Sequence, residues 1–157
     1  MAAELNYVAT WDGMVTFLDE HAELADFKAQ SPKPLRIVRG PRTNKWVESF
    51  APCIVVDLLR DEQGDEPSQA NVHRYTVYFQ LTIVGAGATP EDADDMALRI
   101  NDAVRQAFKG AGRYFGLRAP AGKVLGSNML SSGWDLAERS NACLAVWVHN
   151  RSVQVGT

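Results

Sequence analysis

The sequence is poor in the residues that nucleophilic and metal chemistry most often use. It has two cysteines and three histidines among 157 residues. Cys53 and Cys143 lie far apart in the chain, so the sequence encodes neither a CxxC motif nor a disulfide framework. This cysteine usage predicts a reduced, cytosolic chain.

The histidines stand in no recognisable catalytic or metal-binding context. His21 lies on the apolar side of a predicted helix, and His73 and His149 lie at the ends of predicted strands. A serine or cysteine nucleophile needs a base beside it, and a zinc site usually shows two ligands a few residues apart. Because neither pattern occurs, we expect structural histidines, no metal, no cofactor and no enzymatic activity.

Long apolar runs and an excess of positive charge are also absent. No stretch of about eighteen apolar residues occurs, and no basic segment followed by an apolar one opens the chain, so we expect neither a membrane span nor export. With 16 basic and 19 acidic residues the formal net charge is −3, which gives no overall field for wrapping DNA. Acidic residues cluster at 57–66 and 91–95, and we interpret these clusters as a solvated loop and a helix start.

The clearest element that is present is an amphipathic helix over 89–110. Thr89 suits the N-cap, Pro90 suits the first helical position, and the acids that follow complement the helix dipole. Lys109 and Gly110 form a typical end. The apolar stripe between these ends is rich in alanine, which predicts close packing on a sheet and a role in the core. Its members are Ala93, Met96, Ala97, Ile100, Ala103, Val104, Ala107 and Phe108.

Strands are predicted at 35–39, 51–60 and 73–84, the last with strict alternation of apolar and polar residues. The acidic loop 61–70 separates the second and third, so we expect these two strands to pair as an antiparallel hairpin. A first helix is predicted from a cap at Thr10 or Asp12 to about Phe27. Residues 110–133 are expected to form a glycine-rich loop with short strand pieces, and 134–149 one or two strands with a bulge or turn at Ser140-Asn141.

Together these elements predict an α+β fold, formed as a single domain over 1–157. Its mainly antiparallel or mixed sheet would have four to five strands, with the long helix (about 90–109) and the N-terminal helix packed on it. Gly85 and Gly87 lie in the turn from strand to helix, but the third glycine and the lysine of phosphate-binding loops are missing. The acids that follow would repel a phosphate, so we interpret this segment as a tight turn.

The order of these elements resembles the tail terminator proteins of long-tailed, siphovirus-like bacteriophages. The resemblance spans about residue 10 to 150, and it has no invariant chemical motif. The segments that carry it are Met14–Leu24, Ala51–Leu59, Arg74–Val84 with Thr89–Phe108 (TVYFQLTIVGAGATPEDADDMALRINDAVRQAF over 76–108), and Ala142–His149.

The resemblance implies a structural virion protein of the tail or neck, assembled in the host cytoplasm. Such subunits form a homohexameric ring that caps the tail tube and ends tube polymerisation. The expected partners are other copies of the chain, the tail tube protein and the head-tail connector or stopper protein. DNA would pass through the ring lumen without specific binding. The alternatives are a head-completion or stopper protein of the neck, and a small ligand-binding module whose pocket the half-polar face of 73–84 would line.

A ring subunit needs two different complementary surfaces, and three groups of residues are candidates for them. The acidic loop would line the lumen or dock a neighbour electrostatically, and basic residues at 36–45 would suit an acidic neighbour. The candidate assembly residues are Arg42, Lys45 and Trp46 in one loop, Asp61, Glu62, Asp65 and Glu66 in another, and the aromatic residues Tyr78 and Trp134.

Overall fold

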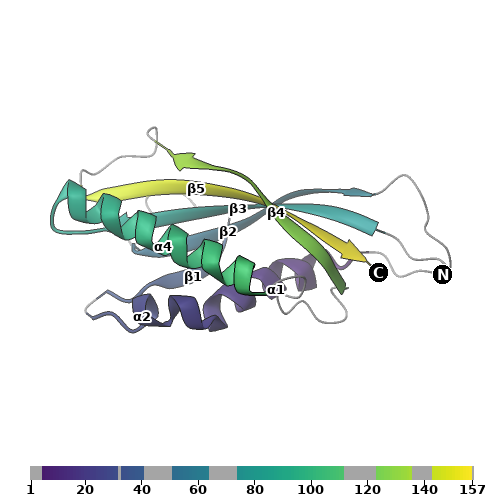
Figure 1. Cartoon of the computed structure of the whole chain (residues 1–157), viewed down its shortest axis with the longest axis horizontal. Helices are drawn as coiled ribbons and strands as arrows, with labels where there is room; N and C mark the ends of the chain where they lie inside the picture. The colour runs from purple at the N-terminus through teal and green to yellow at the C-terminus, as the bar shows by residue number, and fades with distance from the viewer. Residues whose placement is uncertain are drawn as a thin grey trace.

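The computed structural model describes residues 5–31, 33–40, 51–63, 74–111, 123–135 and 143–156 (Figure 1). The helices and strands follow in the order α1 (Tyr7–Glu20), the 3-10 helix η1 (Ala22–Leu24), α2 (Ala25–Lys28), β1 (Arg36–Arg39), β2 (Cys53–Gln63), β3 (Arg74–Ala86), α4 (Pro90–Ala111), β4 (Lys123–Trp134) and β5 (Leu144–Gly156). The α+β class and the five-stranded mixed sheet agree with the prediction.

The sheet has the strand order β1-β2-β3-β5-β4. β2 and β3 pair antiparallel, as expected for the hairpin, and their register runs from Cys53 opposite Val84 to Gln63 opposite Tyr75. β5 lies antiparallel between β3 and β4, while β1 pairs parallel with β2. The order therefore leaves β4 as one edge of the sheet and the short β1 as the other.

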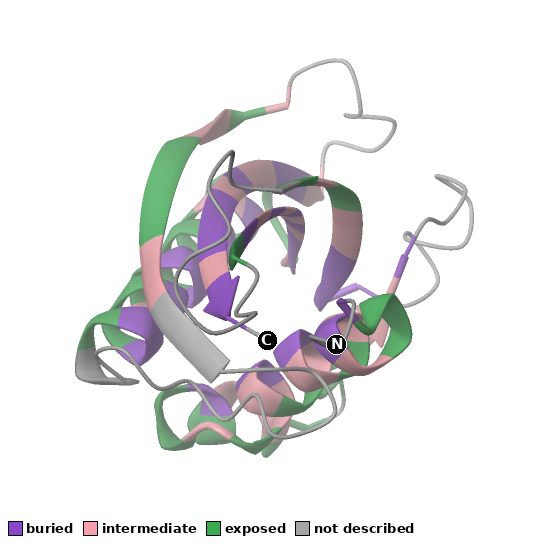
Figure 2. Ribbon diagram, turned by 90° about the vertical axis from the view of Figure 1, so that its right-hand side faces the viewer, coloured by how far each residue is buried: buried purple, intermediate pink, exposed green. Residues whose placement is uncertain are grey.

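Both long helices lie on the same face of the sheet. α4 packs on β3 and β5, and α1 packs on β1 and β2. Viewed along its length, the sheet curls and the helices cover its inner side (Figure 2). The alternating face of β3 predicted from the sequence supplies the centre of this core, because Tyr75, Val77, Phe79, Leu81 and Ile83 are all buried.

α4 forms as predicted and lies very close to the sheet. Its N-cap Thr89 accepts a hydrogen bond through Oγ1 from the Asp92 backbone N–H at 3.2 Å. The alanine-rich stripe faces the core, and Gly85 of β3 lies directly beneath it. A Cβ on Gly85 would lie 2.6 Å from the backbone nitrogen of Ala97, so the glycine permits this close approach. Gly85 therefore serves the packing of α4 on β3.

The N-terminal helix starts earlier and ends earlier than predicted. Asn6 is its N-cap and accepts from the Ala9 backbone N–H at 2.9 Å, while Thr10 is buried inside the first turns. α1 stops at Glu20, and the chain continues through η1 and α2 to Lys28. His21 ends α1 and caps η1, where its Nδ1 accepts from the Glu23 backbone N–H at 3.1 Å. A local side-chain hydrogen bond therefore interrupts the apolar periodicity that suggested one helix.

The predictions for the last third of the chain were partly wrong. Part of the segment expected to be glycine-rich loop is β4, a strand of 12 residues that pairs with β5. Trp134 ends β4, and β5 extends to Gly156, beyond the predicted end at His149. Small and polar residues form β4 because an edge strand is paired and packed on one side only. The predicted turn at 140–141 lies outside the described residues.

β2 also extends into the segment that was assigned to the acidic loop. It reaches Gln63, and its register with β3 shifts between Leu58 and Arg60. The extra residue, Leu59, is 52% exposed. Because of this extra residue, the side chains of β2 change faces of the sheet after Leu58. Asp61 therefore lies on the helix side of the sheet and Glu62 on the opposite side.

Candidate functional site

A buried polar chain joins β5 to α4. His149 is fully buried, and its Nδ1 lies 3.0 Å from Asn101 Oδ1. Arg151 Nε donates to His149 Nε2 at 3.2 Å, and Arg151 Nη1 donates to Ser127 Oγ at 3.3 Å. Because Nε2 accepts, the neutral ring carries its hydrogen on Nδ1 and donates it to Asn101. This network confirms a structural role for His149.

Burial and positive neighbours keep this histidine neutral. Desolvation, followed by the charges of Arg151 and Arg105, lowers the pKa of His149 to about 4. The same causes act on the arginine, since burial and the nearby Arg105 lower the pKa of Arg151 to about 10. The Arg151 guanidinium also lies over the Phe108 ring, 3.9 Å from its centroid. Arg151 is thus a buried cation whose identified partners are all neutral.

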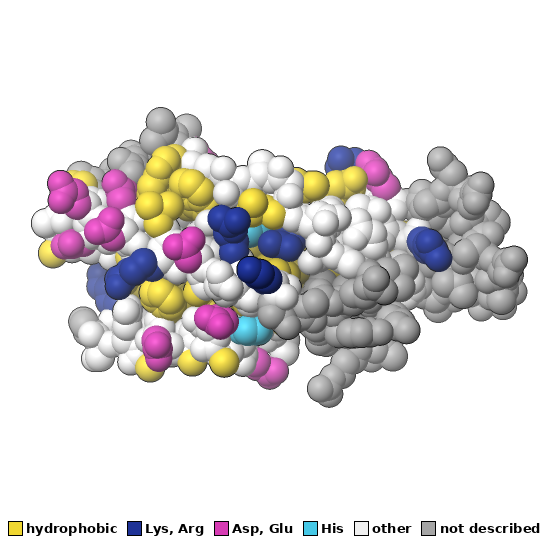
Figure 3. All heavy atoms as spheres, viewed as in Figure 1, with side chains coloured by type: hydrophobic (Ala, Val, Ile, Leu, Met, Phe, Trp, Pro, Cys, Tyr) yellow, Lys and Arg dark blue, Asp and Glu magenta, His cyan; other side chains and the backbone are white. Residues whose placement is uncertain are grey.

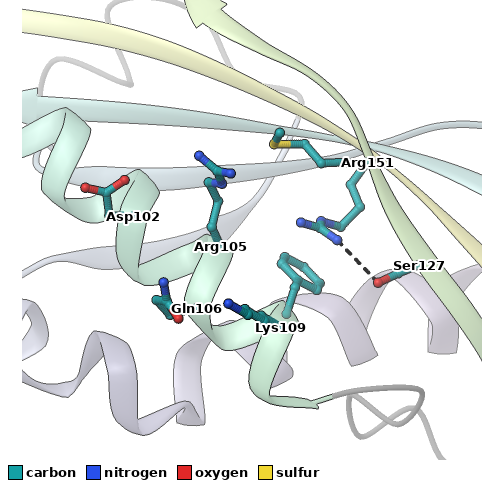
Figure 4. Close-up of a pocket in the computed structure, with 8 residues that line it drawn as sticks. Asp102, Arg105, Gln106, Lys109, Ser127 and Arg151 are labelled. Carbon is teal, nitrogen blue, oxygen red and sulfur yellow. Dashed lines mark hydrogen bonds between the residues drawn. The ribbon is translucent and has the colours of Figure 1, made fainter.

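The side chain of Arg151 lines a pocket between α4 and the strands β4 and β5. The cavity has a volume of about 490 Å³, and Arg105, Lys109, Met129 and Phe108 also contribute to its wall. Arg105 and Arg151 extend into the same space from opposite sides (Figure 4). Among the described residues that line the cavity, Asp102 is the one acid. The pocket therefore carries a positive charge excess in a chain whose net charge is negative.

The charges of α4 are separated along its length. Glu91, Asp92 and Asp95 are exposed in its first two turns, whereas Arg105 and Lys109 are exposed near its end. Acidic side chains accordingly gather at one end of the molecule and basic ones near its middle (Figure 3). The acidic start was expected from the sequence, whereas Lys109 was expected only as part of the end of the helix and Arg105 was given no role.

Exposed apolar side chains lie along the β4 edge beside this pocket. Met129 is 39% exposed, Leu130 54% and Trp134 37%. Trp134 packs edge-on against Trp147 of β5, with the ring centroids 4.9 Å apart. A register shift between Met129 and Ser131 leaves Leu130 as the bulged residue. No other described strand pairs with the outer side of β4, and such an edge with apolar side chains is a surface on which another polypeptide can pack.

A second polar cluster occupies the far half of the β2–β3 hairpin. The Tyr78 hydroxyl donates to Glu62 Oε2 at 3.1 Å, and the Arg60 guanidinium lies 4.2 Å from the centroid of the Tyr78 ring. Arg60 also forms a salt bridge with Glu62. On the other side of the sheet, the Tyr7 hydroxyl donates to Asp61 Oδ1 at 3.1 Å. The hairpin thus carries an exposed patch of mixed charge.

Two of the predicted assembly residues, Glu62 and Tyr78, therefore lie together, while Asp61 lies on the other side of the same hairpin. Asp61, Glu62 and Tyr78 share the hairpin, whereas Trp134 belongs to the β4 edge. The remaining candidates lie outside the described residues: Arg42, Lys45, Trp46, Asp65 and Glu66.

Sequence reasoning missed Arg151. The strand was predicted to stop at His149, two residues before it. Continued alternation from His149 through Arg151 and Val153 was the signal that could have placed all three on one face.

The two cysteines are both placed by the structure, and neither stands in a reactive setting. Cys53 is buried, and burial raises the pKa of its thiol to about 12. Cys143 donates through Sγ to the Ala88 carbonyl at 3.6 Å. Within the described ranges, no three His, Cys, Asp or Glu side chains gather as metal ligands would.

In the part of the chain that the structure describes, no helix is both long enough and apolar enough to cross a membrane.

Comparison with known proteins gives structural likenesses but no match by sequence. No protein-family model matches the chain, and no curated protein matches its sequence. Among solved structures, the fold is similar to that of a chain in the virion of a native gene transfer agent particle. The TM-score is 0.62 at 15% sequence identity, and the match covers 97% of this chain and 100% of the other. The two proteins thus have the same fold through almost the whole of both chains.

Proposed function

We propose that this protein is a structural subunit of a virion, and specifically a tail terminator. It would form a hexameric ring at the end of the tail tube, stop tube polymerisation and present a surface to the head-tail connector. The observation that carries the proposal is the shared fold with a virion chain, which extends over 100% of that chain. Because a fold can serve several functions, the specific role rests on the resemblance to terminators described above.

The surfaces of the chain support a role in assembly. A ring with cyclic symmetry joins two different patches on each subunit. The β4 edge with Leu130 and Trp134 offers an apolar patch, while the hairpin with Glu62 and Tyr78 and the pocket at Arg151 offer charged ones. The hairpin patch with Glu62 and Tyr78 lies on the side of the sheet away from the helices, whereas the pocket adjoins the β4 edge, so two separate surfaces are available to neighbours on both sides.

The test of the terminator role is the phenotype of virions assembled without this protein. A terminator limits tube growth, so we expect overlong tail tubes that lack heads. A neck protein acts after the tail is complete. Tails of normal length that fail to join heads would therefore contradict the terminator role and favour a head-completion or stopper protein.

The acidic hairpin can be tested separately. We propose that Asp61, Glu62, Asp65 and Glu66 line the lumen or dock a neighbour, and that Arg42, Lys45 and Trp46 face an acidic neighbour. Reversing the four acids to lysine is expected to impair ring formation or tail joining. A control reverses three exposed acids of the N-terminal helical segment, Glu20, Glu23 and Asp26. If both variants assemble normally, the hairpin acids have no role in assembly.

A further inference from the structure

The pocket at the end of α4 is a cationic site, because three cations line it against the single acid Asp102 among its described lining residues. Arg105, Lys109 and Arg151 line it, and in the described part of the chain no salt bridge joins any of the three to a carboxylate. The side chain of Arg151 is only 7% exposed, and its position is fixed by His149 and Ser127. A buried arginine held toward two other cations is costly unless an anion approaches it. The arrangement suits an anionic ligand.

The surroundings of the pocket favour protein carboxylates over the phosphates of DNA. Phe108 and Met129 provide apolar surface beside the cations, which suits side chains rather than a sugar-phosphate backbone. Duplex DNA carries one negative charge about every 1.7 Å. A duplex on this pocket would therefore also run past Asp102 and Asp95 of the same helix, which would repel it.

The chain itself exposes a group of acids that matches this pocket. Glu91, Asp92 and Asp95 lie at the start of α4, which forms one end of the elongated molecule, while the pocket lies near its middle (Figures 1 and 3). Thirteen residues separate Asp92 from Arg105, about 20 Å at the rise of a helix. The acids of one α4 therefore cannot reach the cations of the same helix, but those of a neighbouring copy can.

We propose that the acidic tip of one copy, formed by Glu91, Asp92 and Asp95, docks into the Arg105, Lys109 and Arg151 pocket of the next copy. The contact joins two different patches, so it is of the head-to-tail kind from which closed rings are made. This inference rests on the ring proposed above, and it assigns α4 to the subunit interface.

Reciprocal charge reversal tests the contact in the full-length protein. One variant, Arg105→Glu/Lys109→Glu, makes the pocket acidic, and a second, Asp92→Lys/Asp95→Lys, makes the tip basic. Each variant alone is expected to weaken self-association by more than about tenfold, because like charges then meet. An equimolar mixture of the two variants is expected to restore self-association. In the mixture, the basic tip of one variant meets the acidic pocket of the other, and the unchanged acidic tip meets the unchanged basic pocket. The measurement is mass distribution by sedimentation velocity over a concentration series.

Matched controls separate this contact from a general effect of charge. Lys33→Glu changes the net charge in the same direction as the pocket variant, and Glu20→Lys/Glu23→Lys changes it as the tip variant does; all three residues are exposed. The controls are expected to associate as the unchanged protein does. Arg151 is left unchanged, because replacing a buried cation endangers folding.

The outcomes distinguish this contact from the ring itself. If the unchanged protein and both reversal variants all form rings, the proposed contact between tip and pocket is wrong, while the proposed ring is retained. If the variants dissociate but their mixture does not recover, α4 is not joined tip to pocket. If the unchanged protein never assembles, even with tube protein, the ring fails and the contact fails with it. If the pocket variant instead loses binding to duplex DNA, the pocket is a phosphate site and the proposal is overturned.

Discussion

His149 connects the charge state of one side chain to the stability of the fold. Its ring is fully buried, donates to Asn101 and accepts from Arg151. Protonating Nε2 would remove that acceptor and place a second positive charge against the guanidinium. The fold therefore stabilises the neutral form, and the pKa of His149 falls from 6.5 to about 4.

This shift predicts loss of stability in weak acid. Between pH 6.5 and about 4 the unfolded chain binds the proton at His149 while the folded chain does not. The free energy of unfolding therefore falls as the pH falls through this window, by up to about 1.4 kcal/mol per pH unit. Denaturant unfolding at pH 6 and pH 5, at one protein concentration, measures the slope.

A histidine-free variant provides the reference for that slope. His149→Gln keeps an oxygen to accept from Arg151 and an N–H to donate to Asn101, but does not titrate. We expect the variant to be less stable at pH 7 and to lose less stability between pH 6 and pH 5. Equal slopes for the two proteins would show that His149 is not held neutral.

Gly85 is the residue at which the packing of α4 on the sheet is tightest. A Cβ there would collide with backbone atoms of Ala93 and Ala97, which cannot move without displacing the helix. Gly85→Ala is expected to reduce the free energy of unfolding by about 2 kcal/mol or more. Gly133→Ala is the matched control, because no atom lies within 4 Å of its added Cβ. If both variants unfold at the same denaturant concentration, α4 does not lie where the structure places it.

At the scale of elements, prediction from sequence succeeded where a local signal and the tertiary environment agreed. The cap at Thr89, the alanine stripe of α4 and the alternation of β3 each specify one structure. α4 and the β2–β3 hairpin therefore formed as expected. These are also the elements that form the centre of the core.

Prediction failed where tertiary contacts determine the structure. β4 contains Gly126, Gly133 and several serines, so neither propensity nor period distinguishes it from a loop. It is a strand because β5 supplies the backbone partners along its length. The extension of β5 through Arg151 was missed for a different reason, because the alternation that continues past His149 was not followed, and the pocket that Arg151 lines was missed with it. Tyr78 lies on a strand that was predicted correctly, whereas Asp61 and Glu62 were assigned to a loop and belong to β2.

The β4 edge gives a prediction at this scale. Leu130→Glu replaces an exposed bulge residue, so the fold should be retained while self-association weakens severalfold, because a charge then enters the apolar patch. Val8→Glu on α1 is the control, since Val8 is similarly exposed but lies outside the candidate surfaces. Sedimentation velocity compares the two variants. Equal association of both would exclude the β4 edge from the interface.

At the scale of the whole molecule, the protein is an elongated subunit whose surfaces differ in charge and polarity. One end carries the acidic start of α4, the middle carries the cationic pocket and the β4 edge, and the hairpin carries mixed charge. The net charge of −3 supplies no general attraction for DNA, which suits passage of a genome through a ring without retention. These features are compatible with the virion subunit proposed above.

The mass of the purified protein in solution, with negative-stain imaging of the same sample, tests this account most directly. The account predicts closed rings of six copies, formed by the protein alone or after tail tube protein is added. A protein that stays monomeric at every concentration, and forms no ring even with tube protein present, would contradict it.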